Sequence, residues 1–325
     1  MASDAGPGNN KNNCILQGIF MTEAFELSQP SEQTSWLETR LEPQCQRHPG
    51  LSGVHQLSDG LDAFAARYLL MQKAERSLDI QYYIWQNDLS GRLLFSAVLE
   101  AARRGVKVRL LLDDNNTPGL DETLAQLNRH PNIEVRLFNP FSFRTLRALG
   151  YLTDFARLNR RMHNKSFTVD GVTTVVGGRN IGDEYFGTGN EPLFADLDVM
   201  AIGPVVKEVA EDFERYWHSK PVSPLQKVLD DEAPEEDSVS LPAEWRHSEP
   251  VQRYLQRLEN SSLLQELEEG TLALTWAKAR LLSDDPRKGL GKARARSLLP
   301  QRMLEVIGTP QQQFDIISAY FVPTR

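Results

Sequence analysis

Residues 160–180 read RRMHNKSFTVDGVTTVVGGRN, and this stretch decides the fold and the chemistry that we expect. It places His163 two residues before Lys165, and runs rich in β-branched residues stand on either side of Asp170-Gly171. Such runs favour strands, and Asp-Gly between them is a strong signal for a two-residue turn, because both turn positions need positive φ. The stretch therefore predicts a β-hairpin that begins near His163.

The expected register of this hairpin sets the faces of its side chains. A regular two-residue turn pairs Lys165 with Val176. It also places Gly178 opposite His163, where a glycine leaves room for a ligand. Side chains alternate along a strand, so His163 and Lys165 share one face. A nucleophile or base, a cation and an open slot on one face suit a phosphate group.

Composition and charge limit the class of protein. The chain has 325 residues, of which 40% are hydrophobic and 25% charged, as in a soluble globular protein, and this length allows two domains. We find no run of about 18 apolar residues, so we expect no transmembrane helix. The net charge of -8 disfavours a general nucleic-acid binder. Cys14 and Cys45 show no metal-ligand spacing and no disulfide framework, which fits a reducing compartment.

Helical and strand patterns alternate along the first half of the chain, which is typical of an α/β domain with a largely parallel sheet. The expected strands are residues 78–85, 106–112, 133–137 and 197–202. The expected helices are residues 61–75, a helix capped by Ser90 and ended by Gly105, residues 121–129, a helix from Pro204, and residues 249–269. We expect a mixed, mostly parallel sheet flanked by helices on both faces.

Composition divides the chain into four segments. Residues 1–45 are expected to be disordered or loosely attached, because the N-terminal part is rich in Asn, Gly, Ser and Gln. Residues 46–221 form the catalytic domain, and residues 222–247 form an acidic linker. Residues 248–325 contain FDIISAYF (314–321), which echoes LDIQYYI (78–84). We interpret this echo as the start of a second, truncated repeat.

Two basic segments are candidates for lipid contact. Residues 138–161 interleave aromatic side chains with five arginines: Arg144, Arg147, Arg157, Arg160 and Arg161. This segment is either a connection packed on the sheet or a lip that meets anionic headgroups. Residues 280–302 carry Arg287, Lys288, Lys292, Arg294 and Arg296. They predict a flexible basic loop, with a phosphate or headgroup contact as the alternative.

The spacing of His163, Lys165 and Asp170 resembles the HxKxxxxD signature of the phospholipase D superfamily, and GGRN (177–180) stands where that family has Gly-Ser or Gly-Gly followed by x-Asn. The context from DIQYYIWQND (79–88) to FADLDVMAIGP (194–204) is similar to bacterial cardiolipin synthases, most of all the C-type branch without N-terminal transmembrane helices. The resemblance implies a phospholipase D-like fold with two repeats, of which the second is incomplete in this chain.

Phosphodiester chemistry assigns roles to these residues. A covalent route needs a neutral imidazole, cations at the non-bridging oxygens and an acid for the leaving oxygen. His163 is the candidate nucleophile, giving a phosphohistidine intermediate, and Lys165 would bind the phosphate. Gly177, Gly178 and Asn180 are candidate substrate-binding residues that donate hydrogen bonds. The route requires no metal and no cofactor.

Three acidic residues accompany the signature. The imidazole must be held in one tautomer, and by resemblance its partner lies on the strand after the hairpin. Asp196 is the best match for this partner, and Asp198, which has the same parity, stays an alternative. Asp170 belongs to the family signature, but its place in the turn predicts a structural role.

The resemblance implies a cytoplasmic phosphatidyltransferase, associated peripherally with the inner membrane, that makes cardiolipin. The glycerol hydroxyl of phosphatidylglycerol is the acceptor, and phosphatidylglycerol or phosphatidylethanolamine is the donor. We expect no nucleic acid as partner. The alternatives are a phospholipase D-like phosphodiesterase or nuclease that acts as a homodimer, and a truncated product that only binds phosphate or lipid. Because one signature supplies one imidazole, we expect this chain alone to make no cardiolipin.

Overall fold

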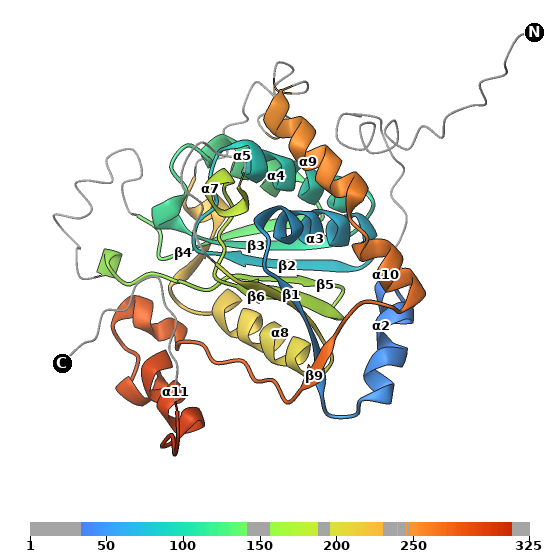
Figure 1. Cartoon of the computed structure of the whole chain (residues 1–325). Helices are drawn as coiled ribbons and strands as arrows, with labels where there is room; N and C mark the ends of the chain where they lie inside the picture. The colour runs from blue at the N-terminus through green and yellow to red at the C-terminus, as the bar shows by residue number, and fades with distance from the viewer. Residues whose placement is uncertain are drawn as a thin grey trace, which may run out of the picture.

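A computed structural model describes residues 34–141, 157–187, 196–229, 239, 245 and 248–313 (Figure 1). Within these ranges a nine-stranded sheet runs in the order β8-β4-β3-β2-β5-β6-β7-β1-β9. In chain order the strands are β1 (Ser52–Leu57), β2 (Ser77–Tyr82), β3 (Lys107–Asp113), β4 (Ile133–Phe138), β5 (Ser166–Val169), β6 (Thr173–Gly177), β7 (Asp198–Ile202), β8 (Val222–Pro224) and β9 (Thr275–Ala277). The four strands that we expected are therefore all present, with bounds shifted by at most three residues.

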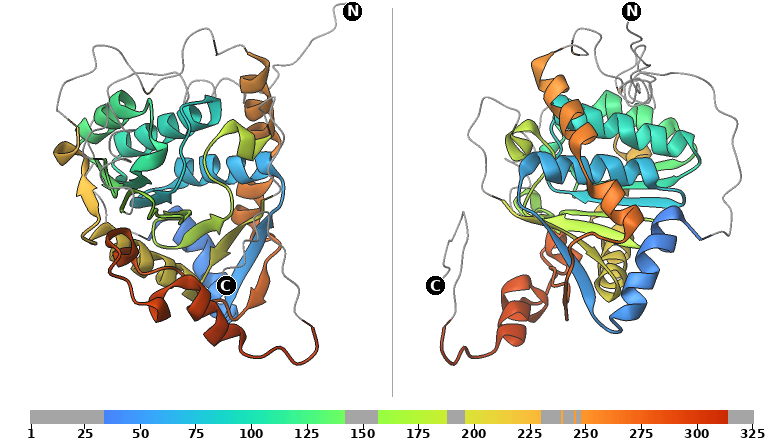
Figure 2. Two further views of the ribbon diagram at one scale, coloured as in Figure 1. Left: turned by 90° about the vertical axis from the view of Figure 1, so that its left-hand side faces the viewer. Right: turned by 45° about the vertical axis from the view of Figure 1, so that its right-hand side comes forward.

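Helices cover both faces of this sheet, as we expected (Figures 1 and 2). The helices are α2 (Trp36–Arg47), α3 (Gly60–Lys73), α4 (Leu89–Arg103), α5 (Asp121–Arg129), α7 (Asp183–Phe186), α8 (Pro204–Trp217), α9 (Glu249–Asn260), α10 (Leu263–Glu269) and α11 (Leu299–Ile307). Helices α3, α4 and α5 lie on one face, and α8 packs on β2, β5, β6 and β7 from the other. None of the described helices is both long enough and apolar enough to cross a bilayer.

The direction of the strands corrects one expectation. In the described sheet β2 is parallel to β3 and β3 is parallel to β4, whereas the other neighbouring strands run antiparallel. The prediction of a mostly parallel sheet is therefore wrong. Parallel neighbours need a crossover such as α4 or α5, and this pattern stops after β4. The tight turn between β5 and β6 then imposes an antiparallel pairing.

Local capping explains how two of the helices begin. Asp59 accepts a hydrogen bond from the backbone N–H of Asp62 and caps α3. Asp88, not Ser90, caps α4, because its carboxylate accepts from the backbone N–H of Gly91. Ser90 lies inside the helix and donates its hydroxyl proton to Asp88, so the expected Ser90 cap is wrong.

The predicted hairpin is present, but the connection between its strands is one residue longer than we expected. Asp170 and Gly171 have φ values of 54° and 70°, as the Asp-Gly signal requires. The backbone N–H of Val172 donates to the carbonyl of Val169 at 3.0 Å, which is the i to i+3 bond of a two-residue turn. Val172 nevertheless stays outside the ladder and Val169 pairs with Thr173, so the predicted register is wrong by one residue.

This slip changes what lies opposite the signature residues. Ser166, not Lys165, pairs with Val176, and β5 begins only at Ser166. His163 and Lys165 therefore lie in the extended segment that leads into β5. Consequently the predicted pairing of His163 with Gly178 is not formed.

The ends of the described chain pack on this sheet. Leu37 and Leu41 of α2 are fully buried, so the expectation of a loosely attached segment is wrong for residues 36–45, whereas residues 1–33 lie outside the described residues. The expected helix 249–269 is two helices, of which α9 packs on α3. Strand β9 pairs with β1. Most of the acidic linker and the FDIISAYF echo lie outside the described residues, so the second repeat stays a prediction.

Candidate active site

A cavity of about 330 Å³ lies between the segment that leads into β5 and helix α8. His163, Lys165 and Ser166 line it from that segment, and Gly177 lines it from the end of β6. The structure thus brings the His-x-Lys pair to one open site, as the sequence predicted. Two further regions line the cavity: Val209 and Asp212 on α8, and residues between Leu281 and Leu299.

The two signature side chains contact each other directly. The Nζ atom of Lys165 lies 3.2 Å from Nδ1 of His163 and donates to the His163 carbonyl oxygen at 2.9 Å. Tyr83 packs against the imidazole with ring centroids 4.5 Å apart, and the same Nζ lies 5.3 Å from the centre of the Tyr83 ring. A charged ammonium can only donate, so Nδ1 of a neutral His163 accepts this hydrogen bond.

The electrostatics of the site suit a neutral nucleophile beside a cation. Part of the His163 ring reaches solvent, but burial of the remainder and the charges of Lys165 and Lys288 lower the pKa of His163 to about 4. Burial also lowers the pKa of Lys165 to about 8, against the opposing effect of Asp196 and Asp198. At pH 7 the imidazole is therefore uncharged, while most Lys165 side chains keep their charge.

Asp198, at the start of β7, has a structural partner on helix α3. Its side chain is fully buried, and Oδ2 accepts from Nη2 of Arg67 at 2.8 Å. Its other oxygen accepts from the backbone N–H of Arg179 at 3.1 Å. These contacts use both carboxylate oxygens to tie β7 to α3 and to the end of the hairpin. Asp198 is thus engaged away from His163.

The two glycines of the signature make room for these acidic side chains. A Cβ atom at Gly177 would collide with the Asp198 carboxylate, and one at Gly178 would collide with that of Asp196. The space at Gly178 is therefore occupied by Asp196 and is not an open slot for a ligand, which corrects the expectation. Asp196 also raises the pKa of Lys165, so its charge reaches the cavity.

Comparison with known proteins shows what this chain is similar to. Residues 69–217 match a family model described as the cardiolipin synthase, phospholipase D-like domain. The chain is 66% identical over 284 residues to cardiolipin synthase C of Escherichia coli (strain K12), covering 87% of this chain and 60% of that protein. The chain thus contains a phospholipase D-like domain at residues 69–217. It is also 33% identical over 210 residues to cardiolipin synthase A of Pseudomonas putida (strain W619), covering 63% of this chain and 42% of that protein.

Among solved structures, phosphatidylserine synthase of Haemophilus influenzae Rd KW20 has a TM-score of 0.41 and 14% sequence identity, over 74% of this chain and 51% of that one. The resemblance to cardiolipin synthases is confirmed by the sequence comparisons. The chain spans 60% of the length of the Escherichia coli relative and 42% of the Pseudomonas putida relative.

Asp170, the acidic residue of the superfamily signature, lies at the far end of β5 from the cavity. Its carboxylate accepts from three consecutive backbone N–H groups, those of Glu75, Arg76 and Ser77, at 2.8–3.2 Å. It therefore fastens the hairpin turn to the beginning of β2. These contacts agree with the structural role that the sequence predicted.

Asn180 also uses its side chain within the scaffold. Its Oδ1 atom accepts from the backbone N–H of Ile84 at 3.1 Å, and the side chain is 5% exposed. The neighbouring Ile181 bridges to Trp85. Asn180 thus joins the end of the hairpin to the loop after β2 and does not line the cavity, so its predicted part in substrate binding stays a prediction.

Sequence reasoning missed Asp113, which holds the residue before His163. Its buried carboxylate accepts from the backbone N–H of Met162 at 2.8 Å and lies 3.4 Å from Nη1 of Arg161. Burial raises the pKa of Asp113 to about 7, although Arg161 opposes the shift. The available signal was an acidic residue at the end of an apolar strand, where a buried carboxylate needs partners.

Sequence reasoning also missed the polar residues that face the cavity from other elements. Gln81 is 1% exposed on β2, and its amide reaches the Met162 sulfur at 2.9 Å. Asp212 is 9% exposed on α8 and accepts from Asn164 at 3.3 Å. A lone Gln in an apolar strand and an Asp beside an apolar helix stripe were the signals. In the described ranges no group of three or more His, Cys, Asp or Glu side chains is placed to hold a metal ion.

Proposed function

We propose that this chain carries half of the active site of a cardiolipin synthase-type phosphatidyltransferase. The observation that carries the proposal is the His163–Lys165 pair, in contact at 3.2 Å beside a cavity. The identity of 66% to cardiolipin synthase C of Escherichia coli supports the choice of reaction. A phosphodiester lipid is the substrate, and the glycerol hydroxyl of phosphatidylglycerol is the acceptor.

The first step uses the neutral imidazole of His163. Lys165 turns from Nδ1 to a non-bridging phosphate oxygen, which leaves the ring free to attack. The ring then forms an N–P bond as the P–O bond to the donor alcohol breaks, and the leaving oxygen takes a proton from a general acid. In the second step the glycerol hydroxyl gives its proton to the same group. Its oxygen forms the new P–O bond, and the N–P bond breaks.

The general acid is a separate group, because His163 is bonded to phosphorus when the leaving oxygen needs its proton. Among the described residues that line the cavity, His163 supplies the one imidazole. We therefore infer that a second signature, in a further repeat or a second copy, supplies the acid and completes the site. General acid catalysis is typically worth about 10²–10⁴-fold, so this chain alone should make no measurable cardiolipin.

Labelling of His163 tests this proposal. In a form of the enzyme that makes cardiolipin, ³²P-labelled phosphatidylglycerol should leave an acid-labile, base-stable label on the wild-type chain. His163→Asn should abolish both label and turnover without changing the unfolding midpoint. His218→Asn is the matched control, because that ring is exposed at the end of α8. Equal label on His163→Asn and wild type would overturn the proposed nucleophile, and labelling that yields only phosphatidic acid would favour the hydrolytic alternative.

We also propose peripheral contact with the cytoplasmic face of the inner membrane. Arg160 is exposed beside the segment that leads to His163. Arg157 instead donates to the Asn139 side chain at 2.5 Å, and Arg144 and Arg147 lie outside the described residues. Flotation with anionic vesicles should weaken on reversal of these four charges, by about 1 kcal/mol for each residue near the surface. Unchanged flotation would contradict the contact.

A further inference from the structure

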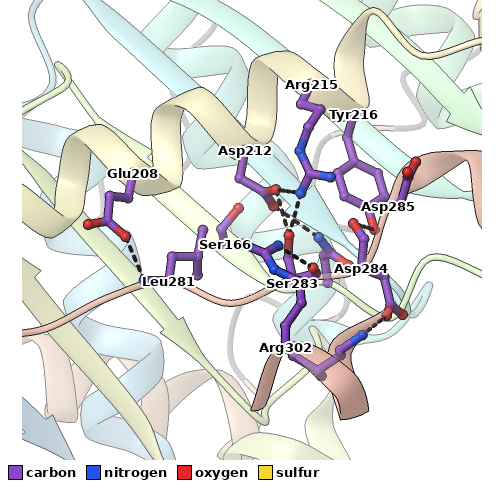
Figure 3. Close-up of polar contacts among 12 residues, drawn as sticks. Ser166, Glu208, Asp212, Arg215, Tyr216, Leu281, Ser283, Asp284, Asp285 and Arg302 are labelled. Carbon is purple, nitrogen blue, oxygen red and sulfur yellow. Dashed lines mark hydrogen bonds and ion pairs between the residues drawn. The ribbon is translucent and has the colours of Figure 1, made fainter. Parts of the chain in front are cut away.

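A segment from outside the matched domain lines one side of the cavity. We call residues 281–299 the strap, and in Figures 1 and 2 the chain that leads from β9 to α11 follows α8. Figure 3 shows its attachment to that helix. The contacts to α8 are Leu281 N–H to Glu208 at 2.8 Å, the Ser283 hydroxyl to Asp212 at 2.6 Å, Arg215 to the Ser283 hydroxyl at 2.6 Å, and the Tyr216 hydroxyl to the Asp284 carbonyl at 3.1 Å. The predicted flexible loop is thus a docked segment.

Two glycines show how closely the strap packs on the domain. A Cβ atom at Gly289 would lie 2.8 Å from Cζ of Phe138 at the end of β4. Gly291 has a φ of 67°, and a Cβ there would lie 2.5 Å from Nη1 of Arg160. The short 3-10 helix Pro286–Leu290, which contains Gly289 and ends before Gly291, therefore rests directly on the body of the protein. This close packing fixes the position of Lys288 relative to the cavity.

Lys288 brings a second cation to the cavity that contains His163 and Lys165. Its side chain lines this cavity, is 19% exposed and forms an ion pair with Asp284. Its positive charge lowers the pKa of His163. Lys288 thus acts electrostatically on the candidate nucleophile, although it lies 125 residues later in the chain.

We propose that Lys288 is a second phosphate-binding residue of this site, positioned there by the strap. This inference rests on the proposed function, because it takes a phosphodiester as the ligand. Such a group has two non-bridging oxygens, and Lys165 alone supplies one ammonium. An ammonium has three donors, so Lys288 keeps its bond to Asp284 while it donates to a phosphate oxygen. Charge-assisted hydrogen bonds of this kind are the stronger ones in proteins.

Binding of inorganic phosphate to the full 325-residue chain tests the assignment, with the His163 ring signal in NMR as the reporter. Lys288→Met should weaken phosphate binding by about tenfold or more, as expected for loss of a hydrogen bond between charged groups. It should also raise the pKa of His163. Lys292→Met is the matched control, because Lys292 is exposed on the same segment and does not line the cavity. This control should match the wild type in both readouts.

A second variant keeps the test independent of folding. Asp284→Asn retains an oxygen for the backbone N–H of Leu299 but removes the charge that competes for Lys288. It should tighten phosphate binding, the opposite of Lys288→Met. If Lys288→Met binds phosphate as tightly as the wild type while Lys165→Ala binds it more weakly, the role of Lys288 is overturned but the site itself is not. Phosphate binding that is insensitive to Lys165→Ala as well, or absent in the wild type, would overturn the site and with it the proposed function.

Discussion

Asp198 begins β7 and Asp196 lies two residues before it, yet the structure predicts opposite consequences for their substitution. Asp198 is 0% exposed, and its partner Arg67 is 1% exposed, with a separation of 2.8 Å between Oδ2 and Nη2. Asp198→Asn leaves the guanidinium buried without a counter-charge. Removing one partner of such a pair typically costs about 3–5 kcal/mol. This is a large part of the roughly 5–15 kcal/mol that stabilises a typical domain.

Urea unfolding followed by tryptophan fluorescence measures this loss. The matched control is Asp79→Asn, because Asp79 pairs with Arg109 on the same sheet with side chains that are 13% and 29% exposed. Arg109 keeps a second partner in Glu214, so this control should lose about 1 kcal/mol or less. Asp196→Asn should leave the unfolding midpoint near that of the wild type and lower the pKa of Lys165, since Asp196 raises it.

Two outcomes would refute this reasoning. One is an Asp198→Asn variant that unfolds within about 1 kcal/mol of the wild type, which would show that the buried pair is not held as described. The other is an Asp196→Asn variant that unfolds much earlier than the wild type. The double variant Arg67→Met/Asp198→Asn should be more stable than the sum of the single losses predicts, because it leaves neither charge unpaired.

Three further predictions follow from the contacts of the scaffold and the charges of the site. Asp170→Ala leaves three backbone N–H groups without their acceptor, so it should lower the free energy of unfolding by about 2–3 kcal/mol or more in urea. Gly177→Ala should destabilise more than Gly178→Ala, because a Cβ at Gly177 would meet the Leu197 backbone as well as Asp198, which Arg67 holds, whereas the nearest atoms at Gly178 belong to the Asp196 side chain; thermal unfolding of both variants ranks them. Covalent labelling of His163 by a short-chain phosphatidylglycerol, in a form of the enzyme that makes cardiolipin, should be fastest between about pH 4 and pH 8. Below this range a proton takes up the lone pair of His163, and above it Lys165 loses its charge. A labelling optimum above pH 9 would contradict these pKa values.

The sequence predicted the parts of the site that depend on near neighbours. The Asp-Gly turn needs positive φ at two adjacent residues, and both residues have it. The spacing of His163 and Lys165 places them on one side of an extended chain, and they meet at the cavity. The extra residue was not predictable, because Val172 is β-branched and continues the strand pattern, yet β6 begins only at Thr173. That one residue shifted the register and invalidated the slot expected at Gly178.

Contacts between distant parts of the chain explain the other errors. The partner of Asp198 is Arg67, which is 131 residues away, and parity along a strand cannot reveal such a pair. Likewise the basic residues after residue 280 read as a solvated loop until Gly289 and Gly291 are seen against Phe138 and Arg160. Close approach of a backbone to a side chain from a distant part of the chain is a property of the fold, so the sequence shows the glycines without showing what they face.

The charges around His163 lead to a further conclusion about the order of events. Burial, together with the charges of Lys165 and Lys288, lowers the pKa of His163 and keeps the imidazole neutral, which makes its lone pair available at neutral pH. An arriving phosphodiester brings a negative charge that offsets these ammonium groups, so the pKa of His163 should rise on binding. A more basic nitrogen is a better nucleophile and a better acceptor of positive charge as the N–P bond forms. The same two cations would therefore protect the nucleophile from protonation in the free enzyme and strengthen it once substrate is bound.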